Sequence, residues 1–531
     1  MSAIGRTFWI ALVIGVVGSI GLLWLPCGEP PQSDCIPLGI PGEWTWGRIT
    51  LEQGEFVEFL LGWLTAGIAL VAYTTVAWLG VLRLKRCSRI ETVLWLTGLV
   101  VVAFFWLTLL QESPKEGYRS SKTAQVLYYP GSSGYFFEAR YQMSDLDSFL
   151  AGYEDRMAEG DVLHVGTHPP GLFVFHRGLI KLCQQSPQLV QQLLEVQPQS
   201  VETAFSLIAE RTHQTPSPLL PPDRAAIWLA ALITQLVGAV ALVPLYALLR
   251  RTLSRQISWM ACSFWPLVPA LAVFLPKSDV IFPFIGLSFL YCWLDGLRRN
   301  SPMLCVLAGL LFWLGMFFSL AHLPFALLAA LLTAWEIKFS ENWWSIEDRW
   351  KKLLAAIGWA TATFLIAVVI LRLAFGVNLF SVWWWNYHNH AAFYDHYSRT
   401  WWKWLLVNPV ELSLAAGLPI FVLALTALLA ASRSMRETLH EGWRRSVGPC
   451  FCCAVVWGAL WLSGKNLGEA ARLWLPLIPW LIWSAAVVLE TGSSTGDSST
   501  DAPPLKRWLV ILVLQGLVCI ATVTRVAGFQ T

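Results

Sequence analysis

Long apolar segments recur from one end of this 531-residue chain to the other. Runs of about 18 or more apolar residues are each long enough to cross the hydrocarbon core of a bilayer. Apolar residues make up 56% of the chain and charged residues only 13%, which excludes a string of soluble domains. We therefore predict an all-α, polytopic membrane protein with about thirteen transmembrane helices. The predicted spans are residues 7–26, 57–82, 92–111, 224–249, 257–275, 280–297, 302–318, 320–337, 353–375, 410–431, 448–463, 474–490 and 508–526.

Short basic segments separate many of these runs, and they predict how the chain is oriented. Counted along the chain, six of them fall on the same side, which the positive-inside rule assigns to the cytoplasm. They are residues 83–89, 250–255, 298–300, 338–352, 433–445 and 491–507. The chain is then an inner (plasma) membrane protein with a cytoplasmic N-terminus. The first run, 7–26, lacks a small-residue cleavage site and is expected to stay as an anchor.

The other side, periplasm or cell exterior, receives the remaining large segments. They are residues 27–56, 112–223, 376–409 and 463–472. Cytoplasmic nucleotides do not reach this side, so a transferase acting here needs a donor that has already crossed, most simply one carried on a lipid. The net charge of +3 gives no indication of a nucleic-acid partner. The Ser/Thr/Gly-rich segment 491–507 is expected to be a flexible cytoplasmic linker.

The large outer segment contains a densely charged stretch, residues 135–171. From Asp145 to Met157, apolar residues recur at helical spacing, which predicts a short amphipathic helix lying flat on the membrane surface. Ser144 or Asp145 is the expected N-cap, and the helix is expected to end at Gly160. An extended run, residues 162–167, should follow.

Asp145 opens this helix, Phe149 follows four residues later, Gly160-Asp161 closes it, and a His168-Pro169-Pro170 turn leads into the next apolar run. This arrangement resembles the integral-membrane glycosyltransferases of the GT-C fold, especially the protein mannosyltransferases and the aminoarabinose lipid A transferases. The likeness is close over about thirty residues and extends loosely over 92–526. It implies a GT-C-like core of about eleven spans at 92–526, with 112–223 as its catalytic loop. Residues 1–91 would then be a two-helix N-terminal extension.

The resemblance implies transfer of a sugar from a polyprenyl-phosphate or dolichyl-phosphate donor to a protein, lipid or glycan acceptor on the outer side. The acidic Asp-Glu pair of those families is here Asp145-Leu146, so Asp147 or Glu138 would stand in for the second acid. We predict that Asp145 is the general base, because a carboxylate at a helix start stays ionised. Asp147 and Glu138 are the other catalytic candidates, and a plain N-cap is the alternative role of Asp145.

Cationic side chains of the outer segments are predicted to hold the donor phosphate. Arg399 leads this group because a planar guanidinium binds phosphate oxygens in pairs. Arg472, Lys465 and His168 are the others. Alternatively, Arg472 forms a surface ion pair with Glu469, three residues before it, and His168 stabilises the Pro-Pro turn.

A second group is predicted to contact the sugar or the acceptor: His388, His390, Asp395 and Glu469. Lys277 and Asp279, at the outer end of a span, are either functional charges or interface anchors. A divalent metal ion remains open as a cofactor, since several His and acidic residues share the outer segments, although no spacing specifies a site.

Two further points stay open at the level of sequence. Cys27 and Cys35 lie in the first outer segment, as a disulfide or as two free thiols. The alternative function is a transporter or lipid flippase, which predicts repeated halves and charges at mid-membrane. Repeats are not visible, and the charges gather at one face, which favours the transferase. One outward site holding Asp145, Arg399 and Arg472 would indicate an enzyme, and a central path would indicate transport.

Overall fold

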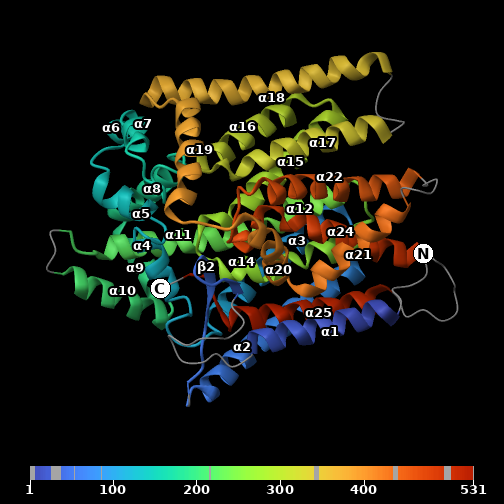
Figure 1. Cartoon of the computed structure of the whole chain (residues 1–531), viewed down its shortest axis with the longest axis horizontal. Helices are drawn as coiled ribbons and strands as arrows, with labels where there is room; N and C mark the ends of the chain where they lie inside the picture. Colours follow the sequence, from blue (N-terminus) through green and yellow to red (C-terminus); the bar gives the residue numbers. More distant parts are fainter. Residues whose placement is uncertain are drawn as a thin grey trace.

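The computed structural model describes residues 6–24, 38–52, 54–84, 87–213, 217–339, 346–434, 441–494 and 504–529. The described chain is predominantly helical, as predicted, with its long helices packed side by side (Figure 1). Within it, eight helical segments are long and apolar enough to cross a membrane, or nine if a bent pair counts as one span. The count of thirteen therefore stays a prediction.

The eight segments correspond to predicted spans. They comprise α2 (Phe56–Arg83), α3 (Arg89–Gln111), α11 (Pro221–Val240) with α12 (Leu242–Leu249), α13 (Arg255–Cys262) with α14 (Pro269–Val273), α15 (Phe282–Arg299), α17 (Leu323–Phe339), α18 (Ile346–Phe375) and α25 (Pro504–Val523). Shorter apolar helices lie on four other predicted spans, namely α1 (Arg6–Trp24), α16 (Pro302–Phe318), α22 (Glu441–Ser463) and α24 (Ile478–Ser494). Helices α1 and α2 pack into the same apolar core as the later helices.

The predicted span 410–431 is not one continuous helix, because the chain bends there. Helix α20 (Trp401–Ala416) meets α21 (Leu418–Ser434) at an angle of 117°. Gly417 makes the bend with a φ of +85°, and a Cβ at this position would lie 2.1 Å from the side chain of Gln515. That Gln515 amide donates to the Ala416 carbonyl (2.8 Å), so the broken helix end is satisfied inside the bundle.

The aromatic segment 376–409 is helical where a loop was expected. Helix α19 (Leu379–His396) stands across the ends of the long helices, next to α7 (Figure 1). Its buried residues include Asn386 and Asn389, so the inward face of this helix is partly polar. An apolar pattern is therefore absent from the sequence, which is why the helix was missed.

Segment 112–223, which was predicted to lie on the outer side, folds into short helices. They are α4 (Lys122–Tyr128), α5 (Tyr135–Phe137), a π-helical turn η1 (Glu138–Gln142), α6 (Leu146–Ala151), α7 (Tyr153–Ala158), α8 (Gly171–Gln185), α9 (Pro187–Glu195) and α10 (Gln199–Thr212). The single helix predicted from Asp145 is in fact two, α6 and α7, separated at Gly152. Its N-cap is Asp145 and it ends before Gly160, whose φ is +83°; both features confirm the prediction.

The extended run predicted at 162–167 is also wrong. These residues form turns, because the Asp161 carboxylate accepts hydrogen bonds from three successive backbone N–H groups. The donors are Leu163 (2.9 Å), His164 (3.0 Å) and Val165 (2.7 Å). An aspartate that gathers local N–H groups competes with strand pairing.

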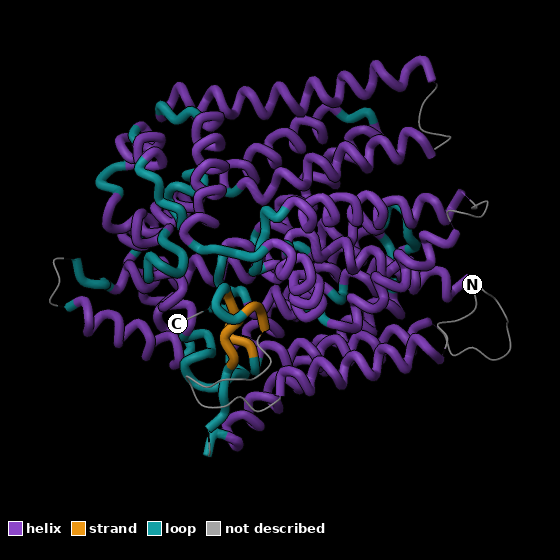
Figure 2. Tube along the Cα trace, in the orientation of Figure 1, coloured by secondary structure: helices purple, strands orange, loops and turns teal. Residues whose placement is uncertain are grey.

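A small antiparallel sheet was not predicted. Strands β1 (Leu38–Ile40) and β2 (Trp44–Arg48) form a hairpin, and β3 (Val526–Ala527) pairs with β2 (Figure 2). Gly39 lies opposite Thr45, and Gly47 opposite Ala527. The sheet therefore joins the beginning of the chain to the segment that follows its last helix.

Contacts bring several of the predicted basic segments to one end of the bundle. Arg255 donates to the Cys87 carbonyl, and Ser254 N donates to the Glu490 carboxylate (3.2 Å). Arg251 forms ion pairs with Asp295 (3.2 Å) and Glu336 (2.8 Å). Parts of the predicted segments 338–352, 433–445 and 491–507 lie outside the described residues, as do Cys27 and Cys35.

Candidate functional site

A polar cluster lies at the opposite end of the bundle, where segment 112–223 folds. Lys277 follows α14, and Arg472 lies in the short helix α23 (Ala470–Leu473). The charges of both residues lower the pKa of His168, and Arg472 also acts on Tyr135 and Lys277. Asp279 acts on the same two residues in the opposite direction and raises the pKa of each. Residues from three distant parts of the chain, 135–168, 277–279 and 472, therefore share one electrostatic environment.

Arg472 and Lys277 form the cationic centre of this cluster. Arg472 pairs with Glu469 at 2.6 Å, as the helical spacing predicted, but its Nε is buried and has no hydrogen-bond partner among the described residues. Lys277 is 8% exposed, and its ammonium lies 5.7 Å from the centre of the Phe529 ring. Burial and the charge of Arg472 lower the pKa of Lys277 to about 7.

Arg399 lies beside the same cluster. Its guanidinium is placed over the Trp404 ring at 5.7 Å and near enough to Glu469 to feel that charge. Both Nε and Nη1 of Arg399 are buried, and the described part of the chain supplies no hydrogen-bond acceptor for them. Two of the predicted donor-binding residues, Arg399 and Arg472, thus flank one carboxylate.

His168 takes part in both the turn and the cluster. Its backbone carbonyl accepts a hydrogen bond from the Tyr153 hydroxyl (2.7 Å), and its Nδ1 lies 3.0 Å from Thr167 Oγ1. The ring meets Tyr135 edge-on, with 5.4 Å between ring centres. Burial, assisted by the charges of Lys277 and Arg472, lowers the pKa of His168 to about 3. The imidazole is therefore neutral at physiological pH.

Asp145 and Asp147, by contrast, are exposed at the start of α6. The Asp145 carboxylate accepts a hydrogen bond from Ser148 N (3.0 Å), and its bonds to Ser148 lower its pKa, with Arg177 adding a smaller effect. Of the contacts between described residues, none joins Asp145 or Asp147 to the cationic cluster. Of the three residues expected to share one site, Arg399 and Arg472 therefore lie together, and Asp145 lies apart from them.

Of the three predicted catalytic carboxylates, Glu138 is the one that is partly buried. It is half-buried in η1 and forms an ion pair with Arg156 at 3.5 Å. Burial raises the pKa of Glu138. The charge of Arg156 lowers this pKa and so offsets part of the rise, whereas the charge of Asp161 adds to the rise. Asp161 in turn holds the backbone of His164, whose ring is 6.4 Å from that of His168.

The residues predicted to contact substrate lie on different faces of the site. His388 and Asp395 are exposed on α19, with the His388 ring 4.9 Å from Trp384. His390 is close enough to His168 to affect its pKa. The Lys465 ammonium lies 4.3 Å from the Tyr387 ring centre on the same helix, so α19 covers the last outer segment.

Two positioning residues escaped sequence analysis. Asn389 donates from Nδ2 to the carbonyls of Met157 (2.8 Å) and Gly166 (2.9 Å), which fixes α19 against the 157–166 segment. Glu43, in the hairpin turn, accepts hydrogen bonds at the start of α20. For Asn389, the sequence offered only a polar residue among aromatic ones. For Glu43, no neighbouring residue indicated a partner 357 positions away in the chain.

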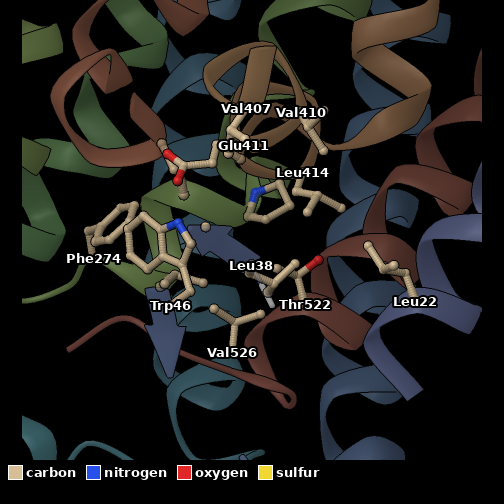
Figure 3. Close-up of a pocket in the computed structure, with 16 residues that line it drawn as sticks. Leu22, Leu38, Trp46, Phe274, Val407, Val410, Glu411, Leu414, Thr522 and Val526 are labelled. Atoms are coloured by element: carbon tan, nitrogen blue, oxygen red, sulfur yellow. The ribbon is translucent and has the colours of Figure 1, made fainter. Parts of the chain in front are cut away.

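An apolar cavity, shown in Figure 3, has a volume of about 230 Å³. Its walls come from α1, the hairpin, α14, α20 and the last strand, with Trp46, Phe274 and Leu414 among the lining residues. Glu411 is the one acidic side chain in its wall, and its Oε2 accepts a hydrogen bond from Ala470 N (2.9 Å). Ala471 also lines the cavity and directly precedes Arg472, so the cavity and the cationic cluster share α23.

Across the described ranges, no group of three His, Cys, Asp or Glu side chains is arranged to hold a metal ion. The histidines and acidic residues that left a metal ion open at the level of sequence therefore form no such group among the described residues. Comparison with known proteins assigns no family, because no family model matches the chain and no curated protein matches it in sequence.

Proposed function

We propose that this protein is a GT-C-like membrane glycosyltransferase that moves a sugar from a polyprenyl-phosphate donor to an acceptor on the outer side of the membrane. One observation carries the proposal. Arg399 and Arg472 each keep at least one buried guanidinium nitrogen without a hydrogen-bond acceptor among the described residues, Lys277 is buried near Arg472, and an apolar cavity adjoins this cluster. Buried donors without acceptors are costly unless a ligand satisfies them. A phosphate attached to an apolar chain supplies both parts.

The chemistry follows from this arrangement. The bond between the sugar and the phosphate oxygen breaks, and the acceptor hydroxyl forms the new glycosidic bond while giving up its proton. The cations stabilise the negative charge that develops on the leaving phosphate. A carboxylate within about 2.6–3.2 Å of the hydroxyl takes the proton.

The three predicted carboxylates differ as candidates for this base. Glu138 is half-buried with a raised pKa and lies next to Asp161 and the His164–His168 turn. Asp145 is an exposed N-cap. A base works best when its pKa approaches the working pH, so the raised pKa of Glu138 favours it over Asp145, whose pKa is lowered.

The proposal includes a topology. Thirteen spans with the basic segments in the cytoplasm would place the cluster in the periplasm or at the cell exterior. In a background without reactive native thiols, Gln191→Cys on α9 and Lys351→Cys on α18 should react with a membrane-impermeant maleimide from opposite sides. Labelling of both from the same side would overturn the topology and the mechanism with it.

The test of activity uses membranes that contain the protein and a panel of radiolabelled polyprenyl-phosphate sugars. Product should form with at least one donor, and Arg399→Ala or Arg472→Ala should reduce it. Arg211→Ala is the matched control, because this arginine lies on α10, and no contact or charge effect among the described residues ties it to the cluster. If every radiolabelled donor remains intact after incubation with each acceptor fraction, the proposed glycosyltransferase activity is contradicted.

The broken pair α20–α21 favours a second candidate, a lipid or oligosaccharide flippase, because transporters often build their sites from discontinuous helices. Reconstituted liposomes distinguish the two. A flippase moves a labelled lipid-linked sugar between leaflets and leaves it unchanged, whereas a transferase consumes it only when acceptor is present.

A further inference from the structure

The turn of the hairpin presents an acidic side chain to the start of α20. Glu43 Oε2 accepts hydrogen bonds from Thr400 N (2.8 Å) and Trp404 Nε1 (2.8 Å). Its Oε1 accepts from the Thr400 hydroxyl and from Lys403 Nζ (3.3 Å). Burial raises the pKa of Glu43, but the four hydrogen bonds from these three residues outweigh it and lower the pKa to about 2. The side chain is therefore a carboxylate at physiological pH.

Those partners surround Arg399. Thr400 is the next residue along the chain, and Trp404 is the fully buried ring over which the Arg399 guanidinium lies. Thr400 is the N-cap of α20, and its side chain makes no capping bond. The Glu43 carboxylate accepts the N–H of this N-cap residue, the role that a Glu at position N3 has in a capping box. Fixing Thr400 and Trp404 restricts the backbone and the ring that position Arg399.

The hairpin is itself fixed at its base. Strand β2 pairs with β3, and Ile49 N donates to the Arg525 carbonyl (3.0 Å) after the last helix. Glu43 N also donates to the Ile40 carbonyl (3.1 Å) across the turn. Glu43 is thus held from behind by the sheet and in front by α20. An N-terminal segment that the sequence assigned to an extension reaches the candidate site.

We infer that Glu43 is a positioning residue for Arg399, which makes the N-terminal hairpin part of the donor-phosphate site. The inference rests on the proposed function for its ligand, a polyprenyl phosphate. Glu43 does not touch the phosphate, and its own charge would repel it. It acts by holding Thr400 and Trp404, so that the unpaired Nε and Nη1 of Arg399 are aimed before the donor arrives.

The experiment is a double-mutant cycle on the full-length protein in detergent. The dissociation constant for polyprenyl phosphate is measured for the wild type, Glu43→Gln, Arg399→Ala and the double variant. Glu43→Gln keeps the volume but removes the charge and one acceptor oxygen, and should weaken binding by about tenfold. In the Arg399→Ala background it should change binding by less than about twofold. Glu55→Gln, which removes a carboxylate paired with Lys115 at 2.7 Å, is the control and should bind normally.

Each outcome of this cycle decides a different point. Equal weakening by Glu43→Gln in both backgrounds, or a lowered melting temperature with unchanged binding, would overturn the positioning role. If the wild type binds no polyprenyl phosphate, the proposed function fails. In that case, the rate of backbone amide exchange over residues 397–404 tests whether Glu43 restrains the segment that carries Arg399. Faster exchange in Glu43→Gln and not in Glu55→Gln supports the positioning role, and unchanged exchange overturns it.

Discussion

The two ends of the helix bundle use their charged residues differently. At the basic end, Arg251 directs one guanidinium nitrogen to Asp295 and the other to Glu336, and Arg299 adds a second ion pair to Asp295 (2.8 Å). At the opposite end, which we call the outer end because the predicted topology places it outside, Arg399 keeps two buried nitrogens without an acceptor among the described residues. Arg472 pairs with Glu469 but keeps a third such nitrogen.

The difference separates charges that are paired within the bundle from charges with donors left over, which the proposed function assigns to a ligand. A cation whose donors already face carboxylates within the bundle ties elements together, here the turn after α12 to α15 and α17. A cation with buried donors left over costs free energy in the empty protein, and this cost falls when an anion binds. Substitutions at the basic end should therefore affect stability, and those at the outer end should affect binding and turnover.

The largest expected effect concerns the general base at the outer end. Glu138→Gln should lower turnover by roughly 10²–10⁴-fold, because the amide cannot accept the acceptor's proton. The melting temperature should change little, since the half-buried Glu138 keeps its shape and loses only a 3.5 Å ion pair to Arg156. Transfer from a saturating radiolabelled donor measures the effect.

Asp145→Asn is the comparison for that variant, because Asn caps a helix about as well as Asp and only the basicity is lost. It should retain most of the transfer, as should Asp147→Asn. If Asp145→Asn abolishes sugar transfer while Glu138→Gln has normal turnover, Asp145 is the general base, as the sequence analysis predicted. Normal turnover in all three variants would favour the flippase.

Removing an ion pair from the basic end should instead destabilise the folded protein. Arg251→Ala leaves Asp295 and Glu336 without this shared cation, and removal of one partner from a buried ion pair typically costs about 3–5 kcal/mol. A large drop in melting temperature in detergent is expected, whereas donor affinity of the remaining folded protein should be normal. Lys338→Ala, a basic residue on α17 whose ammonium contacts the Phe339 ring, is the milder control. A weakened donor affinity in folded Arg251→Ala would break the distinction between the two ends.

Removing a cation from the outer end should weaken donor binding with little loss of stability. Arg399→Ala and Arg472→Ala each remove hydrogen bonds to a charged phosphate worth about 1.5–3 kcal/mol, or roughly tenfold to a hundredfold in dissociation constant. Arg472→Ala also leaves Glu469 unpaired, so its effect on melting should be the larger of the two. Unchanged binding in both variants would make these arginines interface anchors.

Much of this comparison could not be predicted from the sequence, for identifiable reasons. Apolar run length revealed the long helices, and the spacing of Glu469 and Arg472 gave their ion pair. Helix α19 was missed because it buries asparagines, and the bend at Gly417 because the Gln515 side chain that supports it is almost a hundred residues away. Glu43 meets α20 only through the fold. Long-range polar contacts leave no periodic trace in the chain.

The smallest predicted effect is a pH dependence of donor binding from Lys277. Burial and the charge of Arg472 bring its pKa down to about 7, so the ammonium is charged below that pH and neutral above it. Other groups that face it are the carboxylates Asp279 and Glu469 and the imidazole of His168, whose pKa of about 3 keeps it neutral throughout. Affinity for polyprenyl phosphate should therefore fall as pH rises from 6 to 9, by up to about tenfold for one lost charged hydrogen bond. Lys277→Arg should flatten this profile because a guanidinium stays charged, leaving only the titration of the phosphate itself. If the wild type and Lys277→Arg show the same pH dependence of polyprenyl phosphate binding, Lys277 does not bind the phosphate.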